Sequence, residues 1–339
     1  MGKRYGLPYM GSKSKIAEAI VASLPPRKHF VDLFCGGCAV THCAMLSGKW
    51  KDFTINDIEP MIVELFIGAI KRRYHNETRW ISHEDFDRLK TFDPYVAYIW
   101  SFGNNPLKGY MYSRDIEPWK KALHYARVFK DYSLLKAMGI QGDGSRKDIS
   151  DHSKEYLVKY NSWLGRQLET PVRPSLRSLE SLQNLESLER LQNLESLGRL
   201  ESLGRLERLE RLQNLERLER LERLQNHVGD YQEVPIKPDS LIYCDIPYED
   251  TNGYSKAPFD HKRFYDWASK QIEPLIISSY EISDNRFVRL FDVEKAVTMD
   301  ADNTTKKHEG LFVPRSQLDW WKEHTFLSEE CRREQLTLF

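Results

Sequence analysis

The chain has 339 residues, enough for one large domain or two of ordinary size. Lys and Arg together number 50, as do Asp and Glu, so the net charge gives no sign of a nucleic-acid partner and any basic surface must come from local clusters. No apolar run reaches the length of a membrane span, and the N-terminus lacks the pattern of a signal peptide. Five cysteines in a chain this long do not make a disulfide framework. We therefore expect a protein of a reducing intracellular compartment.

The first 75 residues read as alternating helices and strands. Apolar residues at helical spacing, short apolar runs, and Gly or Pro at their ends set the boundaries. The expected elements are a helix that ends at Pro25, a strand over 30–34, a helix over 39–46, a strand over 53–55 and a helix opened by Pro60. This order favours a parallel sheet.

A glycine turn, Gly36 and Gly37, follows the first expected strand. Glycine lets a ligand approach the backbone closely, and the amides of the next helix then face that ligand. Asp57 ends the next strand, about 20 residues on, where an acid can bind both hydroxyls of a ribose. The alternative role for Asp57 is to cap the helix at Pro60. Cys35 and Cys38 have zinc-like spacing but no suitable second pair, so we expect small-residue packing there and no metal.

The pattern loosens from about residue 79 to 167, where Trp, Tyr, Lys, Arg and Asn are dense. Leucine then recurs at every third residue from Leu176 to Leu224. In an α-helix this spacing spirals around every face, whereas in a 3₁₀ helix all these leucines align. The sequence favours a helical rod with a 3₁₀-like stripe; a regular α-helix, a solenoid and a spacer of variable length are the alternatives.

Strand signals return after Asp239, over 241–244, 275–279 and 287–293. The α/β core is thus interrupted by a long insertion. The predicted domains are a core formed by residues 1–78 and 236–339, a target-recognition region over 79–174 and the leucine repeat over 175–228.

Directly after the expected strand over 241–244 comes the tetrad Asp245-Ile246-Pro247-Tyr248. The acid accepts hydrogen bonds, the turn presents a backbone carbonyl, and the ring offers a flat face. This set suits a planar group that carries an exocyclic amine, such as adenine. A hydride-transfer enzyme, which would share the glycine turn, has no use for it.

In this order of motifs the chain resembles the DNA adenine N6-methyltransferases related to the DNA adenine methylase, the class with its recognition domain between the cofactor motif and the catalytic tetrad. The resemblance implies a Rossmann-like core that binds S-adenosylmethionine. The residues that it assigns to the cofactor are Tyr9, Gly11, Lys13, Asp32, Phe34, Gly36, Gly37 and Asp57, and those that it assigns to catalysis are Asp245, Ile246, Pro247 and Tyr248. Cys38 stands where the family's turn has another glycine, and Ile246 stands where its tetrad has proline.

Two further stretches are similar to family motifs. The residues 102–104 and 108–110 resemble a loop near the target base, and Lys306, Lys307 and Glu309 fall in a stretch similar to a late core motif.

The resemblance implies methyl transfer to N6 of a flipped-out adenine in double-stranded DNA. It further implies a bacterial or phage modification enzyme, hence a cytoplasmic one. An RNA or protein-glutamine N-methyltransferase, and a non-catalytic interaction protein built on the leucine repeat, are the alternatives.

Overall fold

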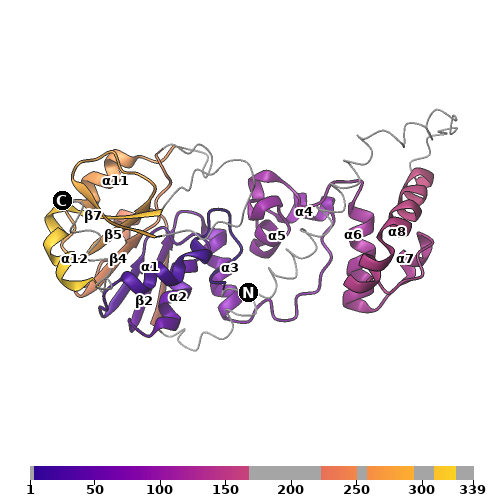
Figure 1. The fold of residues 1–339 in the computed structure, drawn as a ribbon, viewed down its shortest axis with the longest axis horizontal. Helices are drawn as coiled ribbons and strands as arrows, with labels where there is room; N and C mark the ends of the chain where they lie inside the picture. The colour runs from indigo at the N-terminus through magenta and orange to yellow at the C-terminus, as the bar shows by residue number, and fades with distance from the viewer. Residues whose placement is uncertain (1–3, 168–222, 250–257, 294–308, 326–339) are drawn as a thin grey trace. The chain divides into compact units, whose positions relative to one another are not determined.

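The computed structural model describes residues 4–167, 223–249, 258–293 and 309–325. These residues fall into two compact units, one drawn from Met1–His75 and Glu210–Phe339 and the other from Asn76–Leu209 (Figure 1).

The first unit is built on a seven-stranded sheet in the order β3-β2-β1-β4-β5-β7-β6. Strands β1 to β5 pair in parallel, whereas β7 runs antiparallel to both β5 and β6. The strands are β1 (His29–Asp32), β2 (Asp52–Asp57), β3 (Leu224–Val228), β4 (Ser240–Cys244), β5 (Leu275–Ser279), β6 (Phe287–Val293) and β7 (Glu309–Pro314). The strand order reverses between β1 and β4, and ligands of open α/β sheets bind beside the carboxyl ends of such a pair.

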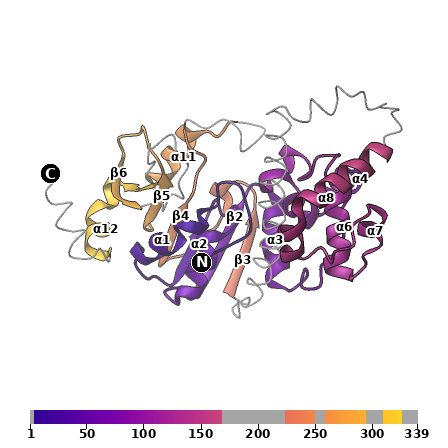
Figure 2. The ribbon, with the colours of Figure 1, turned by 45° about the vertical axis from the view of Figure 1, so that its right-hand side comes forward.

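Helices cover both faces of this sheet, as buried parallel strands require. They are α1 (Ala17–Ser23), α2 (Ala39–Ser47), α3 (Pro60–Ile70), α11 (His261–Ala268) and α12 (Leu318–His324). The side chains of successive residues of β1 point to opposite faces of the sheet. Phe30 packs with Trp50 and Tyr243, whereas Val31 joins a core cluster that contains Phe264 of α11. In Figures 1 and 2, α1 and α2 lie together on one face of the sheet.

Most core elements lie where the sequence predicts them. The predicted strands over 275–279 and 287–293 are β5 and β6, and Pro60 opens α3. The helix predicted over 39–46 is α2, which ends at Gly48 in a left-handed conformation, φ +74°. The predicted α/β class is therefore confirmed for the core.

One boundary differs from the sequence analysis. Residues 224–228, assigned there to the leucine repeat, form β3, which pairs in parallel with β2. An unpaired β2 would expose a row of backbone hydrogen-bonding groups at the sheet edge, and β3 satisfies them. Leu224 thus lies in a strand, and the predicted helical stripe does not extend to it. Residues 175–222 of the repeat lie outside the described residues, so the rest of that prediction stays open.

The second unit is helical in its described part. It contains α4 (His83–Leu89), α5 (Pro94–Ile99), α6 (Glu117–His124), α7 (Ser133–Ala137) and α8 (Arg146–Gln167). Aromatic residues form much of its interior: the Trp80 ring stacks on Tyr112, with ring centroids 6.0 Å apart, and meets Trp100 edge-on. These rings pack through loops as well as helices, which explains why no helical stripe shows in the sequence. The predicted role in target recognition stays a prediction.

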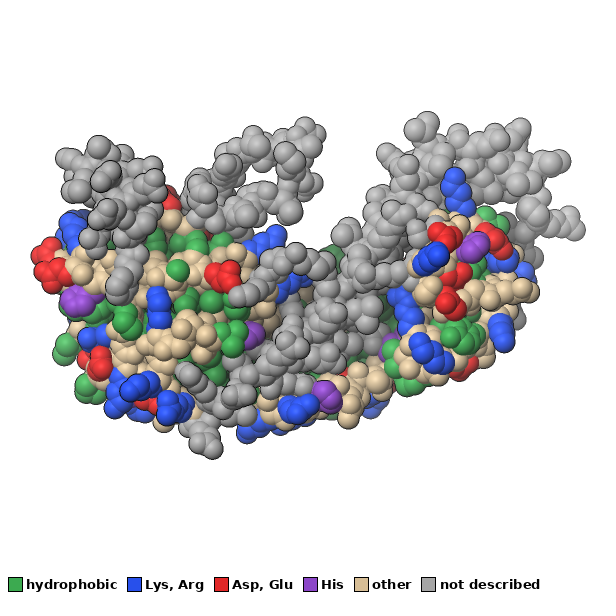
Figure 3. All heavy atoms as spheres, turned by 60° about the horizontal axis from the view of Figure 1, so that its bottom comes forward, with side chains coloured by type: hydrophobic (Ala, Val, Ile, Leu, Met, Phe, Trp, Pro, Cys, Tyr) green, Lys and Arg blue, Asp and Glu red, His purple; other side chains and the backbone are tan. Residues whose placement is uncertain are grey.

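Basic and acidic side chains are interspersed on the face drawn in Figure 3, in line with the balanced charge of the sequence. Among the described residues, no helix is long and apolar enough to cross a membrane.

Candidate active site at the ends of β1, β2 and β4

The glycine turn after β1 is held from two sides. The Cys35 amide donates to the Asn56 carbonyl at 2.9 Å, and the Leu7 amide donates to the Gly37 carbonyl at 2.6 Å. Gly36 has a φ of +44°, and a Cβ there would come within 2.9 Å of the Tyr9 ring. A Cβ on Gly37 would lie 2.7 Å from Tyr9 Cβ. The absence of side chains therefore lets Tyr9 pack directly against the turn at the end of β1, and we call the turn together with Tyr9 the cradle.

Asp57 lies next to this cradle at the end of β2. Its Oδ2 accepts from the Gly36 amide at 2.8 Å and its Oδ1 from the Glu59 amide at 3.0 Å. Glu59, not Asp57, caps α3, because its side chain accepts from the Met61 amide. The alternative role of Asp57 as the helix cap is therefore wrong. The adjacent Ile58 side chain is 76% exposed, an apolar surface next to the acid that the sequence analysis missed.

The structure also describes three other residues that the resemblance assigns to the cofactor. Gly11 is exposed, with φ +83°, in the loop before the short 3₁₀ turn Lys13–Lys15. The Phe34 ring packs edge-on against Phe264, with centroids 5.5 Å apart. Asp32 is buried and accepts from Thr41 Oγ1 of α2 at 2.6 Å. Its visible role is to hold α2 to β1, and a direct contact with the cofactor stays a prediction.

Burial raises the pKa of Asp32 to about 7, and the nearby Asp245 and Asp57 push in the same direction against the hydrogen bond from Thr41. Asp32 is thus a buried acid with a raised pKa, and it lies where the carboxyl ends of β1, β2 and β4 meet.

Lys13 lies at the tetrad that ends in Tyr248, although the resemblance assigns it to the cofactor. Its Nζ is 2.6 Å from Asp245 Oδ1 and 2.8 Å from the Tyr248 hydroxyl, and it lies 5.0 Å from the centroid of the Tyr248 ring. In the chain, Lys13 is 232 positions from Asp245 and 235 positions from Tyr248. The fold thus joins the N-terminal motif to the tetrad at the end of β4.

A second acid completes this cluster. Glu309, at the start of β7, accepts from Ser278 Oγ at 2.7 Å and from the Tyr248 hydroxyl at 3.1 Å. Glu309 Oε1 also lies 3.4 Å from Lys13 Nζ. From the sequence, Glu309 is recognisable only as part of a late motif, because its partners come from distant parts of the chain.

The segment that follows Asp245 is fixed by α11. His261 Nε2 lies 2.7 Å from the Pro247 carbonyl, and the Tyr265 hydroxyl donates to Glu249 at 2.6 Å. These two side chains are four residues apart, so they share one face of α11. Ile246 itself is buried. The tetrad is therefore anchored by tertiary contacts at a position where it lacks a second proline.

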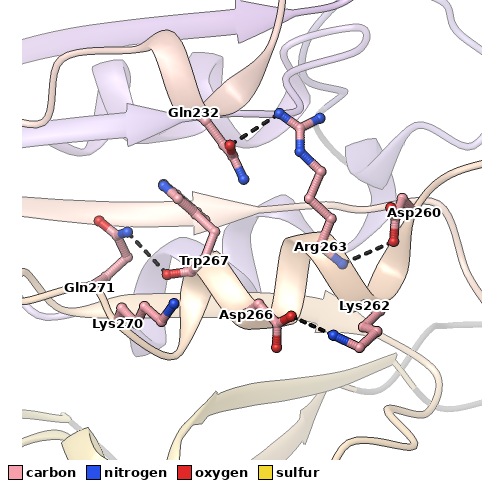
Figure 4. Close-up of a pocket in the computed structure, with 8 residues that line it drawn as sticks. All are labelled: Gln232, Asp260, Lys262, Arg263, Asp266, Trp267, Lys270 and Gln271. Atoms are coloured by element: carbon pink, nitrogen blue, oxygen red, sulfur yellow. Dashed lines mark hydrogen bonds and ion pairs between the residues drawn. The ribbon is translucent and has the colours of Figure 1, made fainter.

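The pocket drawn in Figure 4 belongs to another part of the first unit. It lies on the solvent side of α11, and several of its charged residues pair with one another or with neighbours. Lys262 contacts Asp266 at 2.7 Å, and Arg263 contacts Asp230 at 2.6 Å. None of the predicted site residues lines this pocket, so it is not the candidate active site.

The family model for D12 class N6 adenine-specific DNA methyltransferases matches residues 9–130. The chain is similar to this family over these residues, and the match indicates an adenine-specific DNA methyltransferase. The match confirms the resemblance and supports this activity over the RNA and protein-glutamine alternatives and over a non-catalytic interaction protein. It spans the glycine turn and Asp57 in the first unit and reaches Lys130 in the second. A comparison with curated proteins gave no match.

The matched residues include the loop that resembles the family's target-base loop. Ser101 and Tyr110 form an isolated antiparallel bridge, and between them the loop presents Phe102, 51% exposed, and Leu107, 63% exposed. A contact between these exposed side chains and the target base stays a prediction.

Proposed function

We propose that this methyltransferase uses S-adenosylmethionine, bound by the cradle after β1, and methylates N6 of an adenine held at the tetrad after β4. The observation that carries the proposal is the meeting of Asp57, the glycine turn and Asp245 at the carboxyl ends of neighbouring strands. This is the place where open α/β sheets bind their ligands.

The residues present fit such a cofactor. The cradle places Tyr9 against a glycine turn at the end of β1, Asp57 offers a carboxylate to ribose hydroxyls, and Ile58 offers an exposed apolar surface to a nucleobase. The bound cofactor would supply an electrophilic methyl group on a sulfonium.

The tetrad would hold the amine that receives this methyl group. The lone pair of N6 is conjugated into the adenine ring, so it must be reoriented before it can react. Asp245 and the Ile246 carbonyl each accept one N6 hydrogen in this proposal, which directs the lone pair at the cofactor. Such positioning contributes on the order of several kcal/mol to the rate.

The aromatic ring of the tetrad would hold the base itself. Tyr280 packs against the Tyr248 ring with centroids 4.2 Å apart. We propose that the adenine stacks on the opposite face, a contact worth about 1–3 kcal/mol. An adenine inside a duplex cannot reach such a pocket, so the proposal requires that the base be flipped out of double-stranded DNA.

Purified protein tests this proposal in two steps. Calorimetry with S-adenosylmethionine should show binding, and transfer of a labelled methyl group should occur to duplex DNA and not to total RNA. Asp245→Ala should retain cofactor binding and lose transfer, because its role is to hold the amine. Asp266→Ala, which removes a carboxylate from the pocket in Figure 4, is the matched control and should remain active. Near-normal turnover by Asp245→Ala would remove the tetrad from the active site.

A further inference from the structure

Glu309 is an acid buried where no solvent can balance its charge. Its side chain is 0% exposed, and it accepts hydrogen bonds from Ser278 and Tyr248. A buried carboxylate is costly unless it is paired. Its ion-pair partner is Lys13, at 3.4 Å.

Lys13 is shared between two acids. Its Nζ lies 2.6 Å from Asp245 and 3.4 Å from Glu309. Burial disfavours the charged ammonium, but Asp245 and Glu309 outweigh burial and hold the pKa of Lys13 well above its ordinary value. Two carboxylates and one ammonium leave this cluster with one net negative charge.

We propose that Glu309 supplies the charge balance of the active site: it shares the charge of Lys13, so that Asp245 keeps a negative charge toward the adenine amine. This inference rests on the proposed function and assigns Glu309 a role as a positioning residue, because it does not touch the base. Without Glu309, Lys13 and Asp245 would form a neutral pair.

The methyl-transfer reaction explains why a negative charge on Asp245 matters. The bond from carbon to N6 forms as the carbon–sulfur bond breaks with its electron pair left on sulfur, and positive charge arrives on N6. One N6 hydrogen then leaves as a proton to water. A negative charge fixed beside N6 stabilises that arriving charge more than it stabilises the neutral amine. Preorganised groups of this kind are worth about 10²–10³-fold in rate.

Glu309→Gln tests the inference, because the amide keeps the shape and an acceptor for Ser278 and Tyr248 but removes the charge. The first readout is binding, by calorimetry, of two cofactor analogues. Sinefungin carries a protonated amine at the position of the transferred methyl group, and S-adenosylhomocysteine is neutral there. The variant should bind S-adenosylhomocysteine as the wild type does and lose about tenfold of its preference for sinefungin. Its single-turnover methylation rate should fall by about 10²-fold.

Two further variants separate charge from structure. Glu309→Asp keeps the charge and should retain most of the preference and of the rate. In Lys13→Met combined with Glu309→Gln, Asp245 again carries one net negative charge, so preference and rate should exceed those of Glu309→Gln alone. Glu281→Gln, which removes a carboxylate from an exposed ion pair with Arg289, is the control and should behave as the wild type.

The inference is overturned if Glu309→Gln keeps the wild-type preference and rate, or if the double variant does no better than Glu309→Gln. A wild-type protein that binds neither analogue would contradict the proposed function instead.

Discussion

At the scale of single residues, Asp57 joins two segments that the chain separates by 21 positions. It accepts from the Gly36 amide, so the acid and the glycine turn form one unit of structure. The sequence predicts the residue and its partner turn, because each follows its own strand. It cannot decide between a ribose acid and a helix cap. That choice depends on Glu59, whose side chain takes the cap.

Asp57→Ala should weaken the binding of S-adenosylmethionine by about 1.5–3 kcal/mol, because the ribose hydroxyls lose a charged acceptor. Calorimetry measures the change. Glu59→Ala is the matched control, since it removes the neighbouring acid that caps α3 and should leave the affinity close to that of the wild type. Unchanged affinity in a folded Asp57→Ala protein would limit Asp57 to ordering the turn.

Asp32 makes stability depend on pH. Its pKa is about 7 in the folded protein against an ordinary value of 3.8, so the folded state holds this proton more tightly than the unfolded state does. The proton on Asp32 therefore adds to the free energy of unfolding. This contribution is complete below pH about 4 and is lost as the pH rises through about 7. The loss is on the order of a few kcal/mol.

Asp32→Asn removes this titration and can still accept from Thr41. The melting temperature of the variant minus that of the wild type should therefore increase from pH 5 to pH 8. Melting curves that stay parallel across this range would show that Asp32 does not titrate there.

At the scale of elements, the predictable parts are those marked by local signals. Strands β4 and β5 are short apolar runs, and α2 and α3 begin or end at Gly or Pro. Strand β3 carries no such signal, because its five residues are largely polar and its leucine belongs to the three-residue repeat. The contact between Lys13 and Asp245 could not be predicted either, since it depends on which strands become neighbours.

The anchoring of the tetrad by α11 gives a prediction at this scale. His261→Leu removes the donor to the Pro247 carbonyl and should lower the methylation rate by about tenfold, since one hydrogen bond contributes about 0.5–1.5 kcal/mol. Ile246→Pro fixes φ by covalent means and should recover much of this loss when combined with His261→Leu. Single-turnover rates measure both effects.

His261→Gln retains a side-chain donor and is the control for this pair. The anchor has no part in catalysis if His261→Leu and the wild type methylate at the same rate. If Ile246→Pro fails to improve the leucine variant, the hydrogen bond acts through something other than turn rigidity.

At the scale of the whole molecule, one sheet brings distant motifs together. The family match covers residues 9–130, and Asp245 lies beyond it, yet β1 and β4 are neighbours. The order of the motifs predicts this meeting through the resemblance, whereas hydrophobic patterning alone predicts only an α/β core. The recognition role of the second unit is a prediction that follows from its place between the two motifs.

The central claim is that Asp245 holds an adenine amine for methylation. The most direct measurement is the N6-methyladenine content, by mass spectrometry, of DNA from a host without adenine methylation that expresses the chain. Expression of the wild type should produce N6-methyladenine, and expression of Asp245→Ala at the same level should produce none. DNA without N6-methyladenine in both strains, or equal amounts in both, would contradict the account.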